Sequence, residues 1–432
     1  MASDSPLWPL LSEAPTAEDL ARCVHCGLCL SSCPTYIVTG LEVESPRGRI
    51  HMAKLVNEGR SELTPAIQQH WELCLQCRAC EAVCPSGVPY GRIQEHARAQ
   101  LDHAAPRRRG QRRVRKFLLR NVIARPRVLA ASMAPARWYA NSFVRRLARR
   151  SGLLRGRLGA MESQLPRNVG RPYRPANTAS PSAAAADGTT SGVLFTGCVM
   201  GELFGNVHRA TERVYGRAGI HLEATAGQGC CGALHAHDGD LEFARRLARK
   251  NIAALERTTG PIVVNSAGCG AAMKEYGDLL AGDPKWATRA AAFAARVKDS
   301  SELLNDFPGG TFEGRVAYQD ACHLAHAQRI REQPRTLLGT LAGCSLVETP
   351  GADVCCGAAG IYSLVQSEMS GALRQRKADQ FAAAQPDVVV TANPGCHLQY
   401  EAAVRQAGIP ARVMHLMEVL DEAASSNNQQ QD

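Results

Sequence analysis

The sequence predicts an α+β multidomain protein, with a helical N-terminal domain followed by two copies of an α/β module. Two observations support this prediction. A motif of four cysteines occurs twice before residue 85, with a helical pattern between the copies. After residue 191, short apolar runs typical of buried strands alternate with helical patterns, and the same order of cysteines occurs twice. The predicted segments are 1–101 for the N-terminal domain, 102–174 for a basic helical segment, 175–191 for a flexible linker, and 192–306 and 307–432 for the two modules.

Both N-terminal motifs have the spacing C-x2-C-x2-C-x3-C-P, with which a short loop wraps a 4Fe-4S cluster. The first three cysteines of such a motif bind one cluster, and the fourth binds the cluster of the other motif. In a disulfide framework neighbouring thiols would compete for one partner, and zinc would normally use two separated C-x2-C pairs. The predicted ligand sets are Cys23, Cys26, Cys29 and Cys84 for one cluster, and Cys74, Cys77, Cys80 and Cys33 for the other. Clusters that share loops in this way lie close enough to exchange electrons.

The polypeptide between the two motifs predicts an α-helical ferredoxin domain. A helix is expected from Pro46 to near residue 59, and a shorter helix over 64–71. Arg47, Arg49 and Arg78 lie near the cysteines in the sequence. They either raise the reduction potentials of the clusters or are solvated surface charges.

The composition is that of a soluble globular protein. The chain has 432 residues, 45% of them hydrophobic and 21% charged, which is enough for two or three domains. No basic segment precedes the short apolar run near the N-terminus, and no run of about 18 apolar residues occurs, so we expect neither a signal peptide nor a transmembrane helix. Seventeen cysteines without an export signal predict a cytoplasmic location.

Positive charge is concentrated in residues 102–174, which contain 20 arginine and lysine residues and two acidic residues. Arginines alternate with apolar residues, most clearly in 114–120 and 138–147. Helices of this kind lie on anionic membrane surfaces, so we expect a peripheral location on the inner face of the cell membrane. The acidic face of a partner subunit and a scaffold packed on the cluster domain are alternatives. Nucleic acid, which basic patches also favour, is not the expected partner.

The second half of the chain is an internal repeat. Apolar runs at 193–195, 262–264, 316–318 and 388–390 predict buried strands that end just before cysteines, at the strand ends where α/β sheets bind ligands. Equivalent cysteines are offset by 124, 125 and 127 residues. The repeated cysteines are Cys198, Cys230, Cys231 and Cys269 in the first module, and Cys322, Cys355, Cys356 and Cys396 in the second.

Four cysteines per module fit one or two further iron–sulfur centres, or zinc. The alternative is that they hold a loop together or form a redox-active thiol pair. Cys344 lies outside both patterns and is predicted to be a small buried apolar residue. The neighbouring histidines are candidates for a proton or quinone path, although such residues are more often at the surface or in the core: His235, His237, His323, His326 and His397.

Six strings spread over nearly the whole chain carry a family resemblance: CVHCGLC with SPRGRI, CLQCRACEAVCPSGV, GCCGA, AGCGAAMKEYG, CCGAAG and VTANPGC. The repeats resemble the CCG domains of heterodisulfide reductase and related flavin-linked dehydrogenases. The whole layout resembles the iron–sulfur subunits of bacterial glycolate oxidases. In the heterodisulfide reductase pattern another cysteine precedes the last one by three residues, where this sequence has Ser266 and Asn393. The four remaining thiolates would suit an ordinary cubane.

The resemblance implies an oxidoreductase subunit that accepts electrons from an FAD-binding dehydrogenase oxidising glycolate and passes them toward membrane quinone. We expect no catalytic acid or base and no flavin in this chain, which has no G-x-G-x-x-G motif after a strand. One alternative is the iron–sulfur subunit of a D-lactate or glycerol-3-phosphate dehydrogenase. Another is a heterodisulfide or thiol reductase that uses the adjacent cysteine pairs of the modules. An iron–sulfur protein that binds nucleic acid through the basic segment is the third.

Overall fold

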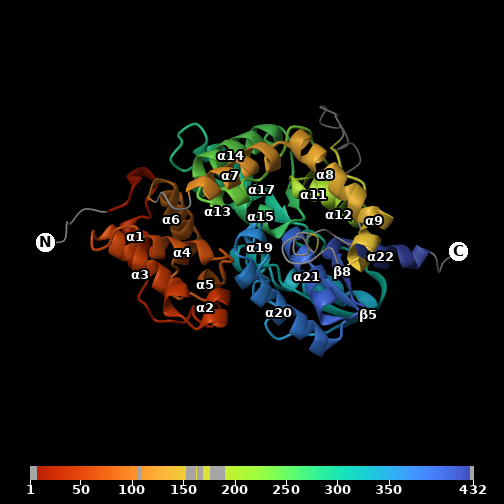
Figure 1. The fold of residues 1–432 in the computed structure, drawn as a ribbon. Helices are drawn as coiled ribbons and strands as arrows, with labels where there is room; N and C mark the ends of the chain where they lie inside the picture. Colours follow the sequence, from red (N-terminus) through yellow and green to blue (C-terminus); the bar gives the residue numbers. More distant parts are fainter. Residues whose placement is uncertain (1–6, 105–108, 152–161, 163–168, 176–189, 429–432) are drawn as a thin grey trace.

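The computed structural model describes residues 7–104, 109–151, 162, 169–175 and 190–428. A helical N-terminal domain lies against two α/β modules, and the helices of the basic segment run along the first module (Figure 1). This arrangement confirms the α+β multidomain class and the repeated modules. The exact domain boundaries stay predictions, and residues 176–189 of the expected linker lie outside the described residues.

The N-terminal domain consists of short helices around the two cysteine loops. Proline starts both predicted helices, and a side-chain cap precedes each one: Ser45 Oγ accepts from the amide of Gly48 at 3.0 Å, and Thr64 Oγ1 accepts from that of Ile67 at 3.3 Å. Both predictions are confirmed. The elements are η1 Leu11–Glu13, α1 Ala17–Ala21, α2 Pro34–Thr39, η2 Glu42–Glu44, α3 Pro46–Asn57, α4 Pro65–Leu73, α5 Ala79–Ala82 and α6 Tyr90–Ala104.

The basic segment links the N-terminal domain to the first module through ion pairs. Its elements are α7 Arg109–Leu118, η3 Leu119–Ile123, α8 Pro126–Asn141 and α9 Phe143–Arg150. Its cations meet acids of both neighbours in the pairs Arg112 with Glu72 (2.9 Å), Arg115 with Asp238 (2.5 Å), Arg120 with Asp240 (2.6 Å) and Arg137 with Glu202 (2.6 Å). Within the described part of the chain, no helix is long and apolar enough to span a bilayer. The segment therefore has a scaffolding role, whatever else it binds.

Each module contains a four-stranded sheet in which every neighbouring pair of strands is parallel. The strand orders are β2-β1-β3-β4 and β6-β5-β7-β8, so the two modules share one topology. The four predicted strands are the central strands of the two sheets, and each sheet adds two edge strands. The first module comprises β1 Thr190–Phe195, α11 Val199–Leu203, α12 Gly205–Arg217, β2 Ile220–Glu223, α13 Ala233–His237, α14 Leu241–Leu255, β3 Ile262–Val264, α15 Ala267–Lys274, α16 Tyr276–Leu279, α17 Ala287–Arg296 and β4 Val297–Asp299. The second comprises β5 Gly310–Tyr318, η5 His323–Ala327, α18 Glu332–Gly339, β6 Leu341–Leu346, α19 Tyr362–Val365, α20 Ser367–Ala384, β7 Val388–Thr391, α21 Pro394–Ala407, β8 Arg412–His415 and α22 Leu416–Asn428.

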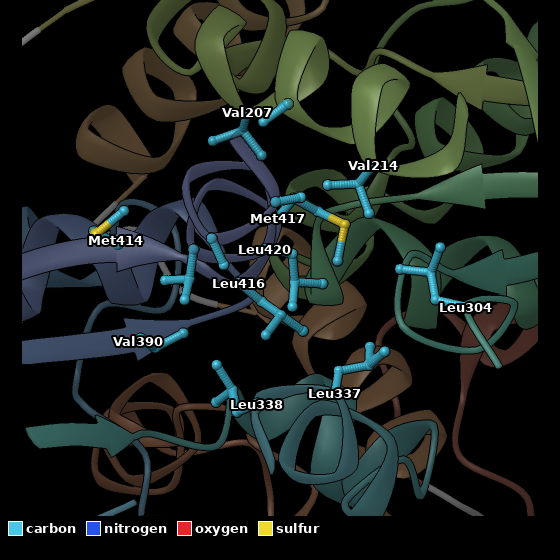
Figure 2. Packing of buried hydrophobic residues seen from close by; sticks show 14 of the residues in the cluster. Val207, Val214, Leu304, Leu337, Leu338, Val390, Met414, Leu416, Met417 and Leu420 are labelled. Carbon is cyan, nitrogen blue, oxygen red and sulfur yellow. The ribbon is translucent and has the colours of Figure 1, made fainter. Parts of the chain in front are cut away.

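The two modules share one hydrophobic core. The C-terminal helix α22 packs between α12 of the first module and β5 of the second. Met417 and Leu420 of α22 meet Val207 and Val214 of α12 in this core, and all four side chains are buried (Figure 2). Burying a large aliphatic side chain contributes about 1.5–3 kcal/mol. The modules are thus held in a fixed relation that places their cysteine loops near one another.

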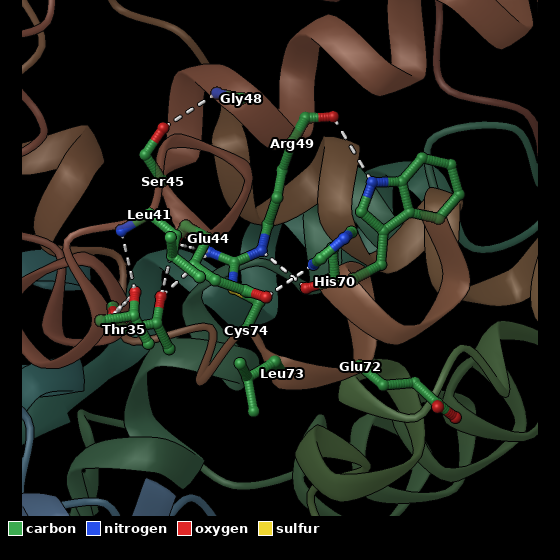
Figure 3. A network of polar contacts seen from close by, with 12 residues as sticks. Thr35, Leu41, Glu44, Ser45, Gly48, Arg49, His70, Glu72, Leu73 and Cys74 are labelled. Carbon is green, nitrogen blue, oxygen red and sulfur yellow. Dashed lines mark hydrogen bonds and ion pairs between the residues drawn. The ribbon is translucent and has the colours of Figure 1, made fainter. Parts of the chain in front are cut away.

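A buried polar network connects the two cysteine loops of the N-terminal domain (Figure 3). The Arg49 guanidinium donates to the Glu44 carboxylate at 2.6 Å, to Thr35 Oγ1 at 3.1 Å and to the His70 carbonyl at 2.7 Å. Thr35 follows the first loop and lies 3.2 Å from the Cys33 sulfur, while His70 lies in α4, which leads into the second loop. Arg49 therefore fixes the spacing of the two loops.

We expect Arg49→Met to destabilise this domain far more than Arg47→Met does. The Arg49 and Glu44 side chains are 1% and 6% exposed, so the variant removes the arginine partner of a buried carboxylate and leaves it only His70, whose Nδ1 lies 2.6 Å away, at a cost of about 3–5 kcal/mol. The side chains of the matched pair, Arg47 and Glu42, are 30% and 48% exposed, so solvent screens this pair and its loss should cost little. Hydrogen exchange of the α3 and α4 amides measures both changes as free energies of opening. Equal effects of the two substitutions would contradict this account of the network.

Candidate metal centres

The two cysteine loops of the N-terminal domain have the same backbone conformation. The second residue after the first cysteine has a left-handed φ in both loops, 56° at His25 and 53° at Gln76. The fourth is also left-handed, with φ 86° at Gly27 and 64° at Arg78. Left-handed conformations cost non-glycine residues about 1–2 kcal/mol, so the surrounding structure must hold these positions in place. The repeated spacing in the sequence thus corresponds to a repeated local fold.

The structure brings each predicted ligand set to one pocket. One pocket is lined by Cys23, Cys26, Cys29 and Cys84, and also by Cys80. The adjacent pocket is lined by Cys33, Cys74, Cys77 and Cys80. All seventeen cysteines lie in the described part of the chain and none forms a disulfide. This donor set fits two iron–sulfur clusters with an exchanged fourth ligand, although the assignment of individual ligands stays a prediction.

Burial determines the protonation of several of these thiols. It raises the pKa of Cys29 to about 11, and it raises the pKa values of Cys77 and Cys80 well above the ordinary value. Iron binds thiolates, so insertion of a cluster has to release these protons. Among the described residues, no three His, Cys, Asp or Glu side chains are grouped so as to hold one metal ion. The thiols of a cubane instead bind separate irons.

The cysteines of the first module converge at the carboxyl ends of three parallel strands. Cys198 follows β1, the pair Cys230 and Cys231 follows β2, and Cys269 follows β3. The sulfurs of Cys231 and Cys269 are 3.2 Å apart. Hydrogen bonds with Cys198 and Cys231 hold the pKa of the Cys230 thiol well below its ordinary value. Gly232, at φ 89°, turns the chain directly into α13.

The second module repeats this arrangement. The sulfurs of Cys322 and Cys355 are 3.9 Å apart, and a hydrogen bond with Cys355 holds the pKa of Cys322 well below its ordinary value. Hydrogen bonds with Cys355 and Cys396 do the same for the pKa of Cys356. Each module therefore gathers its four predicted cysteines into one group of interacting thiols. The outlying Cys344 is half-buried in β6.

Asn393 stands where the heterodisulfide reductase pattern has its additional cysteine. Its side-chain amide donates to the Cys396 sulfur at 3.5 Å, and its carbonyl oxygen accepts from the amide of Gly268 in the first module at 3.2 Å. Next to it, the Ala267 amide donates to the Ala392 carbonyl at 3.1 Å. Asn393 thus orients one candidate ligand and joins the two modules at their cysteine ends.

The second cysteine loop packs directly on the second module. Cys77 shares a buried apolar cluster with Cys322, Cys355 and Tyr362. The Tyr362 hydroxyl also donates to the carbonyl of Leu73, just before the loop, at 2.8 Å. Two cysteine sites that are distant in the sequence are therefore contiguous in space. The sequence contains no signal for this contact.

Arg78 connects the same loop to the first module. Its guanidinium makes two hydrogen bonds with the Glu275 carboxylate, at 2.5 and 2.9 Å, and the side chain is 9% exposed. Arg49 and Arg78 are therefore buried in ion pairs rather than solvated, whereas Arg47 is partly exposed. The interpretation that these arginines are solvated surface charges is therefore wrong for Arg49 and Arg78.

A cavity lies beside this ion pair, between α6 and the first module. Its lining includes Arg78, Glu275, Cys231, His237 and His323. The His237 and His323 rings stack with their centres 5.2 Å apart, and His237 Nδ1 lies 2.9 Å from the Glu95 carboxylate. The other candidate histidines lie elsewhere: His235 is buried beside Asp240, His326 bonds the Asp353 carbonyl, and His397 lies near Glu401.

We expect Tyr90→Phe to lower the reduction potential of the cluster held by the second loop. The Tyr90 hydroxyl donates to the Cys74 sulfur at 3.7 Å, and hydrogen bonds to cluster sulfurs stabilise the reduced, more negative state. A hydrogen bond worth about 0.5–1.5 kcal/mol corresponds to about 20–65 mV for one electron. EPR-monitored redox titration measures the shift. Tyr362→Phe, which removes a hydroxyl bonded to a carbonyl instead, should change the potential less; an equal shift would contradict the role given to Tyr90.

Comparison with known proteins supports the cysteine sites. A 4Fe-4S dicluster domain model matches residues 19–88, and a cysteine-rich domain model matches residues 193–274 and 316–401. The model of the linker region of the glycolate oxidase iron–sulfur subunit matches residues 110–165. The protein thus carries multiple iron–sulfur clusters.

Relatives match the chain over most of its length. The probable glycolate oxidase iron–sulfur subunit of Bacillus subtilis is 36% identical over 94% of this chain and 94% of its own. The glycolate oxidase iron–sulfur subunit of Escherichia coli is 33% identical over 95% of this chain and 96% of its own. Lactate utilization protein A of Bacillus pumilus is 30% identical over 53% of this chain and 98% of its own. From the two cysteine pockets, the paired modules and these full-length matches, it follows that the chain belongs to the family of glycolate oxidase iron–sulfur subunits.

Proposed function

We propose that this chain is the electron-transfer subunit of a flavin-linked glycolate dehydrogenase. It accepts single electrons from an FAD-binding partner subunit that oxidises glycolate, and it passes them toward membrane quinone. The observation that carries this proposal is the packing of Cys77 in one buried cluster with Cys322 and Cys355, which supports a route from the N-terminal pockets into the second module. When bound, the clusters supply the one-electron steps that a two-electron flavin reaction requires.

The two N-terminal pockets differ in exposure, and this difference gives the route a direction. Cys26 is exposed, and Val24 and Leu28 beside it are 67% and 59% exposed. Cys77 is buried against the second module. Electron transfer between proteins needs close approach, so the flavoprotein docks beside the exposed first loop. Electrons then leave through the buried second loop toward the modules.

In this proposal the chain's own residues hold the clusters and set their environment. Cys23, Cys26, Cys29 and Cys84 bind the exposed cluster, and Cys74, Cys77, Cys80 and Cys33 bind the buried one. The cysteine group of each module binds a further iron–sulfur centre. Arg49 and Arg78 hold the loops in place. No side chain of this subunit acts on the hydroxy acid.

Exposure of the thiols weighs against a thiol reductase as the second candidate. Cys230 and Cys231 are 2% and 4% exposed, and Cys355 and Cys356 are 4% and 2% exposed. A disulfide substrate would have to reach these sulfurs directly. The match to lactate utilization protein A favours another 2-hydroxy acid, such as D-lactate, as the alternative substrate of the partner subunit. Glycerol-3-phosphate is a further alternative substrate.

We expect glycolate to reduce the clusters of this chain only when the proposed FAD-binding partner subunit is present. Cys77→Ser should keep glycolate-dependent reduction of the exposed cluster but lower electron transfer to a quinone at least about tenfold, because the buried cluster is lost. Anaerobic EPR after addition of glycolate, with quinone reduction followed in parallel, measures both effects.

Cys344→Ser is the matched control and should behave as the wild type. Reduction of the clusters by D-lactate or glycerol-3-phosphate, but not by glycolate, would contradict glycolate as the substrate of the flavoprotein. A wild-type protein that none of these substrates reduces through the flavoprotein would contradict the proposed function itself.

We further propose that the exposed faces of α8 and α9 bind the anionic inner surface of the cell membrane. Trp138 and Phe143 are 66% and 71% exposed on these neighbouring helices. Exposed arginines accompany them, Arg127 on α8 and Arg146 on α9. Apolar side chains that enter the headgroup region, flanked by cations, are typical of interfacial helices.

The double variant Trp138→Ser, Phe143→Ser should bind anionic vesicles at least about tenfold more weakly, since each large apolar side chain contributes about 1.5–3 kcal/mol when buried. Cosedimentation with phosphatidylglycerol vesicles measures the affinity, and phosphatidylcholine vesicles test the contribution of charge. The control is Leu364→Ser, Val365→Ser, which removes two exposed apolar residues of α19. Equal losses in both double variants would contradict a specific membrane face.

A further inference from the structure

The two modules have equivalent helices beside their cysteine pairs. A Cβ added at Gly232 would lie 3.4 Å from Ala244 of α14, and one added at Gly357 would lie 3.2 Å from Ser370 of α20. Ala244 and Ser370 are therefore equivalent, and they are separated by 126 residues in the sequence. The same separation relates Asn251 to Lys377. Both are buried polar residues facing the cysteine loop of their own module.

In the first module this position is neutral. The Asn251 side-chain amide donates to the carbonyl of Cys230 at 2.9 Å, and its oxygen accepts from the amide of Gly229 at 2.9 Å. Asn251 thus satisfies the backbone of the first cysteine of the pair and of the residue before it. It adds no charge to the site.

In the second module the same position carries a buried cation. Lys377 is 2% exposed, and its ammonium donates to the carbonyls of Gly351 and Ala352 at 2.8 and 3.2 Å and to Gln319 Oε1 at 2.9 Å. These partners are neutral, and among the described residues Lys377 forms no ion pair with a carboxylate. Burial lowers the pKa of Lys377 to about 8, while the nearby thiols, Cys356 foremost, act in the opposite direction. Donation to three oxygen atoms takes three N–H groups, which only the protonated ammonium has.

Other charges near the two sites are more evenly matched. Each site has one histidine beside a cysteine: His235 near Cys230, and His323 with Nδ1 3.6 Å from the Cys322 sulfur. His235 also lies 3.8 Å from the Asp240 carboxylate. The first module also has a lysine near its cysteine loop, since Lys250 Nζ would lie 3.6 Å from a Cβ added at Gly229, but Lys250 is exposed. The burial of Lys377 is therefore the main difference in charge between the two groups of thiols.

We propose that Lys377 makes the cysteine site of the second module the higher-potential centre of the two modules, and thus the one that accepts electrons from the buried N-terminal cluster. Adding an electron makes a thiolate-bound centre more negative, and a buried cation stabilises that state with little screening. Lys377 acts on the site through its positive charge and does not bind iron. The inference rests on the proposed function and on a cluster in the second module.

The contact between Cys77 and Cys322 supplies the path for this step. With clusters bound, one electron would pass from the cluster held by the second loop to the centre held by the cysteines of the second module. No bond forms or breaks, and no proton is required. A shared environment of buried apolar side chains, Leu75 and Tyr362 among them, surrounds the contact. A low-dielectric setting of this kind strengthens the effect of the lysine charge.

The test is an EPR-monitored potentiometric titration of the full-length protein with Lys377 replaced by Met or by Gln. The signal of the second module is identified by its loss in Cys356→Ser. At a fixed potential, the ratio of reduced to oxidised centre should fall at least about tenfold in both variants, which for one electron is a midpoint shift of about 59 mV downward. The midpoints of the two N-terminal clusters should stay unchanged, which also reports that the protein has folded.

Lys250→Gln is the matched control, because Lys250 is an exposed lysine on α14, next to the position equivalent to Lys377. It should leave the second-module midpoint unchanged. An unchanged midpoint in both Lys377 variants, or no signal that depends on Cys356, overturns the proposal. Failure of the glycolate assay with a normal Lys377 shift would instead overturn only the proposed function, because the titration requires no flavoprotein.

Discussion

The ion pair between Arg78 and Glu275 is the constraint on which the arrangement of redox sites depends. Arg78 lies between two predicted ligands of the second loop, in a left-handed conformation that favours glycine. The equivalent residue of the first loop is Gly27. The second loop therefore bears a conformational cost of about 1–2 kcal/mol that the first loop avoids. Its arginine makes a two-point contact with the first module, which a glycine could not make.

The contact of Arg78 with Glu275 helps to explain why the two copies of one cysteine motif differ in solvent exposure. Both loops have the same backbone, but the second is enclosed by the modules on both sides: Arg78 meets the first module, and Cys77 meets the second. The first loop has no such cover over Cys26. A buried ion pair seldom adds much net stability, but breaking it leaves an unpaired charge, so it is effective at fixing one geometry. The difference in exposure that gives the route its direction thus accompanies a difference between two equivalent loop positions, Gly27 and Arg78.

The sequence was sufficient for features that depend on local spacing. The cysteine motifs, the helices started by Pro46 and Pro65, and the central strands of both sheets have continuous local patterns. The edge strands were missed because they carry fewer buried apolar residues: β6 has only Leu341 buried, and β2 only Leu222. The contact between Cys77 and Cys322 could not be predicted, since it arises from packing between domains. The charge of the basic segment was evident, but the acids that pair with it, such as Glu72 and Asp240, are far away in the sequence.

Duplication of a module also explains how a difference in charge can arise without a change in fold. The backbone around the cysteine pairs is kept by Gly232 and Gly357, both left-handed, and by the same strand order. What varies is the side chain that faces the loop from the following helix. An asparagine there supports the backbone through neutral hydrogen bonds, and a lysine supports it through the same kind of bonds while adding a charge. One substitution at a position with a structural role can therefore separate the electrostatics of two sites that share a strand order and a pattern of cysteines.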